Sequence, residues 1–290
     1  MEVGVARARR RSPAALAAVV VALALLAAAC GGASPPAAPT HSRTGAAPLS
    51  VEYAPGLVED VYLPSGRRTA PLVLMVPGGS WATADPTGLA DLAGYLADSG
   101  SVAVPARIRA ANDGVRYPVP VDDVLCALAA AAVTARAHGV DPTPLVVLGH
   151  SSGAHLAALA VLAADEHPPA CRAPAVRPDA LIGLAGPYDV SQVPDMAQAL
   201  FGTTPEQDPA TWAAGNPARR AQLRPEVPVL LMHGGDDPVV PASFTADFAA
   251  RLRQAGHPVT MELVPHADHG SVYSAAVAGP VITRWLMRLR

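Results

Sequence analysis

The sequence predicts an α/β fold with a mostly parallel central sheet flanked by helices. The main observation is that short apolar runs, typical of buried strands, alternate with amphipathic or alanine-rich segments, typical of helices. A second observation is that Leu72–Val76 is apolar without interruption, as expected of a strand that is covered on both faces. Strand and helix that alternate in this way indicate a parallel sheet with helices on both faces.

The predicted elements begin with a hairpin of two short strands, Ser50–Tyr53 and Leu57–Leu63, separated by Pro55-Gly56. The main-sheet strands are predicted at Leu72–Val76, Ser101–Val104, Leu145–Leu148, Ala180–Leu184, Val227–Met232 and Val259–Val264. The helices are predicted at Asp85–Asp98, Pro118–His138, Ala154–Asp165, Ala242–Ala255 and Ser271–Arg288. Residues 186–224 are too long for a plain connection and predict a small lid over the strand ends, with apolar surface from Met196, Leu200, Phe201 and Trp212.

The first 29 residues predict a secretory signal peptide. Arginines at positions 7 and 9–11 precede an apolar run from Ala14 to Ala29, which ends in small residues. The stretch Leu26–Gly32 resembles a bacterial lipobox, in which Cys30 becomes the acylated N-terminus after cleavage. Ala27 stands where leucine is more usual, so ordinary secretory cleavage stays open as the alternative. Either route places the mature protein outside the cytoplasm, and lipidation would hold it on the outer face of the cell membrane.

Residues 30–48 predict a flexible tether, because their Gly, Ala, Ser, Pro and Thr cannot bury enough apolar surface to fold. Residues 49–290 then suit one domain. The chain of 290 residues has a net charge of −3 and no basic patch, which argues against a nucleic-acid partner. Cys126 and Cys171 leave two alternatives open in an oxidising compartment, a disulfide or buried free thiols.

The segment Gly149-His150-Ser151-Ser152-Gly153 has the G-x-S-x-G pattern of a nucleophile elbow. It follows the apolar run Leu145–Leu148 and precedes an alanine-rich helix, the strand-turn-helix context that this motif requires. The turn would hold Ser151 in a strained conformation above the sheet, with glycines where a side chain would clash. The Ser152 amide and the positive end of the new helix would then face a carbonyl oxygen as it becomes negative.

A serine nucleophile needs a histidine base and an acid that orients this base. Hydrolases built on such a sheet supply them in the order Ser, Asp or Glu, His, on loops after later strands. Asp236 and Asp237 follow the strand predicted to end at Met232, and His266 and His269 follow the strand predicted to end at Val264. The sequence therefore offers an acid and a base at both expected places.

The domain from about Leu49 onward resembles an α/β-hydrolase, and within that fold the hormone-sensitive-lipase-like and feruloyl-esterase-like branch of secreted esterases and lipases. The resemblance rests on Gly78–Trp81, Gly149–Gly153, Gly186–Asp189, His233–Pro241 and His269–Gly270. It implies that the acid is Asp237, four residues after the histidine of the H-G-x-x-D turn, and that the base is His269, directly before a glycine. Asp236 and His266 are then solvated loop residues.

The turn at Gly78-Gly79 resembles the H-G-G loop of this family, which supplies further oxyanion amides. The resemblance implies this role for the amides of Gly79 and Ser80, together with that of Ser152. Pro77 replaces the histidine that usually orders the loop, which puts the placement of these amides in question. Trp81 leaves two alternatives open: it lines the substrate pocket, or it closes the core beneath the loop.

The remaining histidines do not predict a metal site. No pair has the spacing of a zinc-ligand set, and neither cysteine has a suitable partner. His150 at the variable position of the elbow and His155 in the following helix are expected to pack or to form hydrogen bonds.

Together these features predict a serine hydrolase that cleaves small or accessible carboxylic esters through Ser151, His269 and Asp237, without a metal or organic cofactor. Its partners would be a small-molecule ester and, through the lipid anchor, the membrane. A serine peptidase, an acyltransferase or an inactive surface binding protein on the same fold are the alternatives. The oligomeric state is not predicted.

Overall fold

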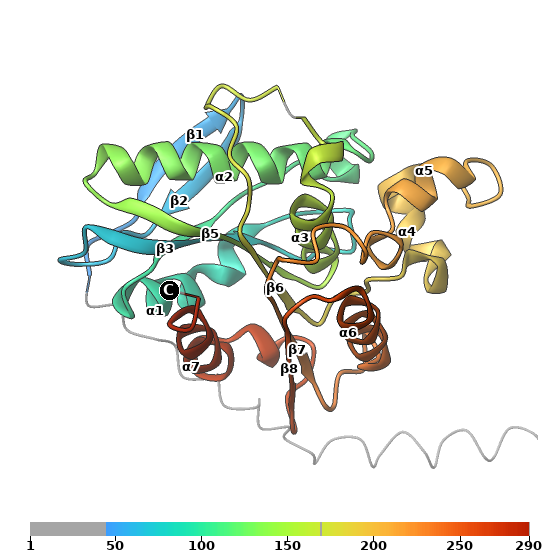
Figure 1. Cartoon of the computed structure of the whole chain (residues 1–290). Helices are drawn as coiled ribbons and strands as arrows, with labels where there is room; N and C mark the ends of the chain where they lie inside the picture. Colours follow the sequence, from blue (N-terminus) through green and yellow to red (C-terminus); the bar gives the residue numbers. More distant parts are fainter. Residues whose placement is uncertain (1–44, 169, 290) are drawn as a thin grey trace, which may run out of the picture. The chain divides into compact units, whose positions relative to one another are not determined.

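The computed structural model describes residues 45–168 and 170–289. Its main sheet has six strands, all paired in parallel, in the order β4-β3-β5-β6-β7-β8 (Figure 1). The strands are β3 (Thr69–Val76), β4 (Val102–Pro105), β5 (Asp141–His150), β6 (Ala180–Leu184), β7 (Val229–Gly234) and β8 (Val259–Val264). The predicted signal peptide and Cys30 lie outside the described residues, so their assignment stays a prediction.

Helices cover both faces of this sheet, which confirms the predicted α/β architecture. They are α1 (Ala90–Asp98), α2 (Val119–Ala137), α3 (Ser152–Leu162), α4 (Pro194–Phe201), α5 (Pro209–Ala214), α6 (Ser243–Ala255) and α7 (Ala275–Leu286). Figure 1 shows α2 and α3 on one side of the sheet and α1 and α7 on the other. In the part of the chain that the structure describes, no helix is long and apolar enough to cross a membrane.

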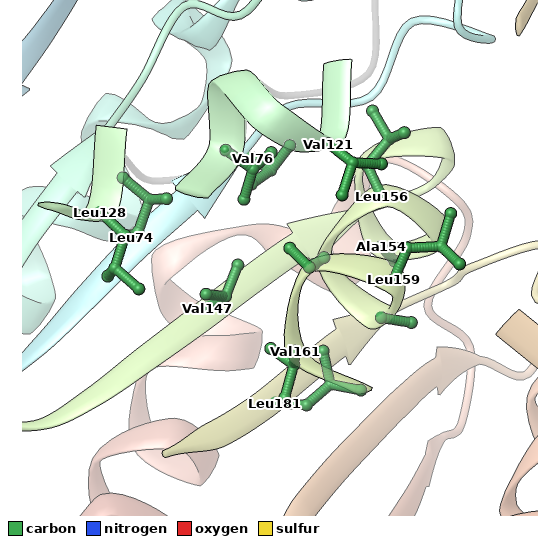
Figure 2. Packing of buried hydrophobic residues seen from close by; sticks show 14 of the residues in the cluster. Leu74, Val76, Val121, Leu128, Val147, Ala154, Leu156, Leu159, Val161 and Leu181 are labelled. Carbon is green, nitrogen blue, oxygen red and sulfur yellow. The ribbon is translucent and has the colours of Figure 1, made fainter. Parts of the chain in front are cut away.

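The two faces of the sheet follow from the two-residue period of a strand. In β3, Leu74 and Val76 belong to the buried cluster that includes α2, α3 and α6, whereas Val73 and Met75 belong to the cluster that includes α1 and α7. Figure 2 shows the first cluster, with Val147 of β5 among the side chains between the sheet and helices α2 and α3. Because β3 and β5 need apolar side chains on both faces, each contains an uninterrupted run of apolar residues in the sequence.

The order of the strands reverses next to β3. The chain passes from β3 to β4 on one side and then returns to place β5 on the other side of β3. Such a switch point leaves a crevice outside the carboxyl ends of the two strands, where α/β proteins bind ligands. The turn that begins at Pro77 and the predicted elbow at Ser151 follow β3 and β5, so both lie at this point.

The segment 186–224 differs from the predicted lid. It contains α4 and α5, but the side chains of Leu200, Phe201 and Trp212 are buried in the main core cluster instead of forming an apolar surface. Only Met196 of the four is exposed, at 41%. Phe201 and Trp212 stack on each other with ring centroids 4.3 Å apart, which fixes the two helices together.

The two cysteines of the domain form a disulfide. Cys126 on α2 is bonded to Cys171, in the connection that precedes β6. The sequence did not decide between a disulfide and free thiols, because the distance between Cys126 and Cys171 depends on the path that the connection before β6 takes past α2.

An antiparallel hairpin of β1 (Leu49–Ala54) and β2 (Leu57–Val61) packs beside the edge strand β4. Its attachment places one carboxyl group in the core: Glu59 is an inward residue of β2, is 1% exposed, and pairs through its backbone with Ala106. Among the described residues, neither carboxyl oxygen of Glu59 has a hydrogen-bond partner. Burial therefore raises the pKa of Glu59 well above its usual value.

We expect the Glu59→Gln substitution to stabilise the protein increasingly as the pH rises. The folded state holds the Glu59 proton to a higher pH than the unfolded state does, so the stability of the native protein falls with a slope of up to about 1.4 kcal/mol per pH unit above the unfolded pKa of about 4.3. Glutamine has the same shape and does not titrate, so this loss disappears.

Urea unfolding at a series of pH values from acid to alkaline measures the effect. The exposed Glu262 provides the matched control, because Glu262→Gln should shift the stability by a similar amount at each pH. Parallel curves for Glu59→Gln and the native protein would show that Glu59 is not held protonated.

Candidate active site

Ser151 occupies the turn between β5 and α3 in a conformation that few residues other than glycine adopt. Its φ is 54° and its ψ is −127°. The Ser151 amide donates to the Leu184 carbonyl of β6 at 2.9 Å, and the Ser151 carbonyl accepts from the Ala154 amide at 2.9 Å. Both bonds anchor the strained residue to regular structure, which is how such a conformation persists.

The two glycines of the elbow are required by close backbone packing. A Cβ at Gly149 would lie 2.2 Å from the Gly153 carbonyl oxygen, and a Cβ at Gly153 would lie 2.4 Å from the carbonyl oxygens of Val76 and Pro77. No side chain fits at such distances, so the elbow lies directly against the end of β3. The predicted nucleophile elbow is therefore formed as the sequence indicates.

The predicted acid and base meet across the ends of β7 and β8. The His269 ring donates from Nδ1 to Oδ2 of Asp237 at 2.7 Å, and the Asp237 side chain is completely buried. Asp236 and His266 instead face each other at 3.4 Å on the surface, with 65% and 92% of their side chains exposed. The structure thus pairs the two residues that the resemblance selected and leaves the alternatives in solvent.

Asp237 is held as a carboxylate by its surroundings. Burial alone would raise the pKa of Asp237, but hydrogen bonds from the Val240 amide, the His269 ring and the Val239 amide outweigh it and lower the pKa below its usual value. Both amides donate to Oδ1, at 2.8 Å from Val239 and 2.9 Å from Val240, which leaves Oδ2 for His269. The carboxylate is therefore oriented as well as charged.

A buried histidine, His233, contacts Asp237 and its loop from the end of β7. Its ring is fully buried, and burial lowers its pKa, so it is neutral near pH 7. Nε2 lies 2.8 Å from the Val240 carbonyl, to which it must donate, and 3.2 Å from Oδ2 of Asp237; Nδ1 accepts from the Thr245 hydroxyl of α6 at 2.7 Å. The sequence showed His233 only as part of a motif, because its contacts with Asp237, Val240 and Thr245 depend on how the β7 loop and α6 fold back over the strand.

The loop after β3 has three consecutive residues with positive φ: Gly79 at 140°, Ser80 at 53° and Trp81 at 57°. Its start lies against the nucleophile, since a Cβ at Gly78 would be 3.0 Å from Cβ of Ser151. The Gly79 carbonyl accepts from the amides of Ala82 and Thr83, which closes the turn. This geometry supports the predicted oxyanion role of the Gly79 and Ser80 amides, which stays a prediction, as does that of the Ser152 amide at the start of α3.

Trp81 anchors this loop in the core, which supports the second of its two predicted alternatives and rules out the first, that it lines the substrate pocket. The side chain is 2% exposed and Nε1 donates to Nδ1 of His155 at 3.2 Å. His155 in turn donates from Nε2 to the Gly215 carbonyl at 2.9 Å. The loop is therefore ordered by a buried Trp81–His155–Gly215 chain of hydrogen bonds, although Pro77 replaces the usual histidine.

A cavity of about 320 Å³ opens in front of Ser151. It is lined by the turn after β3, the elbow, the ends of the β7 and β8 loops, and two short 3-10 helices, η1 (Pro86–Leu89) and η6 (Ser271–Tyr273). The lining residues are Pro77, Gly78, Gly79, Ser80, Asp85, Gly88, Leu89, His150, Ser151, Val239, His269 and Tyr273. Ser151 and His269 thus face one space, together with Gly79 and Ser80.

The cavity also shows what sequence reasoning missed. The sequence did not indicate four of the lining residues as part of the site, because only their position after the carboxyl end of a strand points to it. These residues are Asp85, Leu89, Val239 and Tyr273. Of the described residues, none between 186 and 224 lines this cavity, so this insertion does not form the predicted lid over it. Residues 45–168 and 170–289 also contain no cluster of three or more His, Cys, Asp or Glu side chains that could hold a metal ion.

This parallel sheet, with a serine elbow after β5 and an Asp–His pair from the β7 and β8 loops, defines an α/β-hydrolase fold. The BD-FAE family model matches residues 59–252, and the chain belongs to this family.

Curated relatives include two esterases of Mycobacterium tuberculosis (strain ATCC 25618 / H37Rv). Esterase LipQ is 27% identical over 268 residues, which cover 83% of this chain and 61% of the relative. Esterase LipC is 30% identical over 232 residues, which cover 73% of this chain and 56% of the relative. The chain therefore spans little more than half the length of these relatives.

Solved structures support the fold. A truncated carbohydrate esterase from gut microbiota has a TM-score of 0.69 at 20% identity, over 80% of this chain and 90% of that chain. The butyrate-bound esterase Est2 of the planctomycete Thermogutta terrifontis has a TM-score of 0.63 at 23% identity, over 80% and 87%.

The neighbouring carboxylates of the β7 loop provide a matched pair of substitutions. We expect Asp237→Asn to lower kcat for ester hydrolysis by about 10⁴-fold, because an amide cannot hold His269 in the tautomer whose Nε2 accepts a proton. Asp236→Asn changes an exposed residue of the same turn and should leave kcat within about twofold of the native value. Steady-state kinetics with one activated ester measures both, and equal losses in the two variants would contradict the assignment of the acid.

Proposed function

We propose that this protein is a serine hydrolase of carboxylic esters, with Ser151 as nucleophile, His269 as general base and acid, and Asp237 as the orienting acid. The observation that carries the proposal is the cavity that Ser151 and His269 both line, with His269 bonded at 2.7 Å to a buried Asp237. The names of the relatives support an ester as the substrate.

In the proposed mechanism, Oγ of Ser151 attacks the ester carbonyl carbon while Nε2 of His269 takes the hydroxyl proton. Asp237 stabilises the imidazolium that forms, since its carboxylate accepts from Nδ1. The amides of Gly79, Ser80 and Ser152 bind the oxyanion, and the collapse of the tetrahedral intermediate releases the alcohol with the proton from His269. Water then attacks the acyl-enzyme carbonyl while His269 takes its proton, and the second tetrahedral intermediate collapses as His269 returns this proton to Oγ of Ser151, which releases the acid and restores the nucleophile.

The proposed substrates are small or accessible esters. The cavity of about 320 Å³ is at the low end for small-molecule sites, and its walls are short turns instead of a long apolar channel. A long acyl chain would have to extend along the protein surface.

We expect purified protein to hydrolyse short-chain nitrophenyl esters faster than long-chain ones, and Ser151→Ala to lower kcat by about 10⁶-fold. The exposed Ser65 is the matched control, because it precedes the amino end of β3, away from the cavity, and Ser65→Ala should keep native activity. A fluorophosphonate probe should label the native protein and the Ser65 variant but not Ser151→Ala.

Outcomes of the same panel separate the alternatives. If the probe labels Ser151 and the protein hydrolyses peptides, or transfers an acyl group to an added alcohol, but does not hydrolyse esters, then the protein is a peptidase or an acyltransferase instead of an esterase. No labelling and no turnover would indicate an inactive binding protein.

We further propose that the chain is exported and acylated at Cys30, which would tether the enzyme to the outer face of the cell membrane. The arginines before the apolar run and the small residues before Cys30 support this proposal. The segment 31–48 would act as the tether between the membrane and the catalytic domain.

We expect Cys30→Ser to abolish incorporation of a fatty acid and to move the protein from the detergent phase to the aqueous phase. Expression of the full chain in a bacterium that processes lipoproteins, with an alkyne fatty acid in the medium, measures this change. A Cys126→Ser/Cys171→Ser variant removes the other two cysteines and should still incorporate the label. Equal labelling of the Cys30 variant and the native chain would contradict acylation at this residue.

A further inference from the structure

His150 lies between Gly149 and Ser151, at the variable position of the elbow, and its side chain is 8% exposed. It lines the active-site cavity and contacts the segment that carries His269, 119 residues further along the chain.

The contact with this segment has both a polar and an aromatic part. Nε2 of His150 lies 2.8 Å from the main-chain oxygen of His269, and a carbonyl only accepts, so Nε2 carries the proton and donates it. The His150 ring centroid lies 4.7 Å from that of His269 and 4.3 Å from that of Tyr273. One side chain therefore contacts both the backbone and the ring of the proposed base.

The other side of His150 faces the oxyanion loop. A Cβ at Gly78 would lie 3.2 Å from Nδ1 of His150, so the loop after β3 packs closely on this ring edge. Burial, together with the neighbouring His269, lowers the pKa of His150 to about 4. The ring is therefore neutral near pH 7 and adds no positive charge beside the imidazolium that forms on His269 during the reaction.

The backbone of His269 needs such a support. Asp237 orients its ring through Nδ1, and Asp268 closes the following turn by accepting from the amides of Gly270 and Ser271. Neither contact fixes the main chain at His269 relative to the elbow. The His150 bond does, because the residue that donates it is covalently joined to Ser151.

We propose that His150 is a positioning residue for the reaction: its Nε2–H bond to the His269 carbonyl sets the distance between the base and the nucleophile. The inference rests on the proposed function, since it assigns His150 a role in the proton transfer between Ser151 and His269. A displacement of about 1 Å at a reacting group can cost about 10²-fold in rate, so a single hydrogen bond at this point is enough to matter.

Two variants separate the hydrogen bond from the ring. His150→Phe keeps an aromatic ring against His269 and Tyr273 but has no donor, whereas His150→Gln loses the ring and keeps an amide donor that reaches about as far as Nε2. We expect His150→Phe to lower kcat for a short-chain nitrophenyl ester by about 10- to 100-fold with KM within about threefold. His150→Gln should recover most of kcat, and His138→Gln on the exposed end of α2 should match the native protein.

The proton NMR signal of the His269 Nδ1–H bonded to Asp237 gives a second readout that needs no ester turnover. We expect this far-downfield signal to be lost or broadened in His150→Phe and retained in His150→Gln, at melting temperatures close to that of the native protein. Native kcat in His150→Phe with an unchanged signal would overturn the proposal, as would equal losses in both variants.

The two readouts also separate this inference from the proposed function. If the native protein does not hydrolyse esters, the proposed function fails, while the NMR comparison of the two variants still decides whether His150 positions His269.

Discussion

The active site depends on a close backbone contact at the carboxyl ends of β3 and β5. The chain at Gly153 approaches the carbonyl oxygens of Val76 and Pro77 so closely that a Cβ would lie 2.4 Å from them, and Gly149 is equally crowded by Gly153. The elbow and the loop after β3 are therefore one rigid unit. A nucleophile and amides that must face the same carbonyl oxygen gain from such a unit, because they need no rearrangement during the reaction.

Two neutral histidines extend this rigidity to the acid and the base. His233 is buried beneath Asp237 and bonds the acid loop to Thr245 of α6, while His150 bonds the His269 backbone to the elbow. Burial lowers the pKa of both. Each neutral ring carries one N–H proton, which it can donate to a carbonyl oxygen. Neither ring then adds a positive charge next to Asp237 and His269, where the imidazolium of His269 would form.

Patterns of neighbouring residues predicted most of the fold, whereas features that depend on contacts between distant parts of the chain could not be predicted from the sequence alone. Apolar runs placed all six strands of the main sheet: five have mostly buried side chains, and only β8 at the edge is partly exposed. The strict G-x-S-x-G spacing placed Ser151 because only glycine fits beside it. The pairing of Asp237 with His269 needed the family resemblance, since Asp236 and His266 are equally close in the chain. The two alternatives for Trp81 could not be separated from the sequence, because its partner, His155, lies 74 residues away.

The insertion between β6 and β7 shows why length alone does not predict a lid. The aromatic side chains of Phe201 and Trp212 turn inward and stack, so α4 and α5 are part of the core, and the cavity is lined by η1 and η6 instead. These two turns are held by carboxylates at their starts: Asp85 accepts from the Thr87 amide, and Asp268 accepts from the Gly270 and Ser271 amides. Gly88 also faces the Tyr273 hydroxyl across the cavity, where a Cβ would already be at 3.4 Å. Single turns that are held in this way and contact each other have little freedom to open, so under the proposed function the size of the cavity would restrict the acyl group or alcohol.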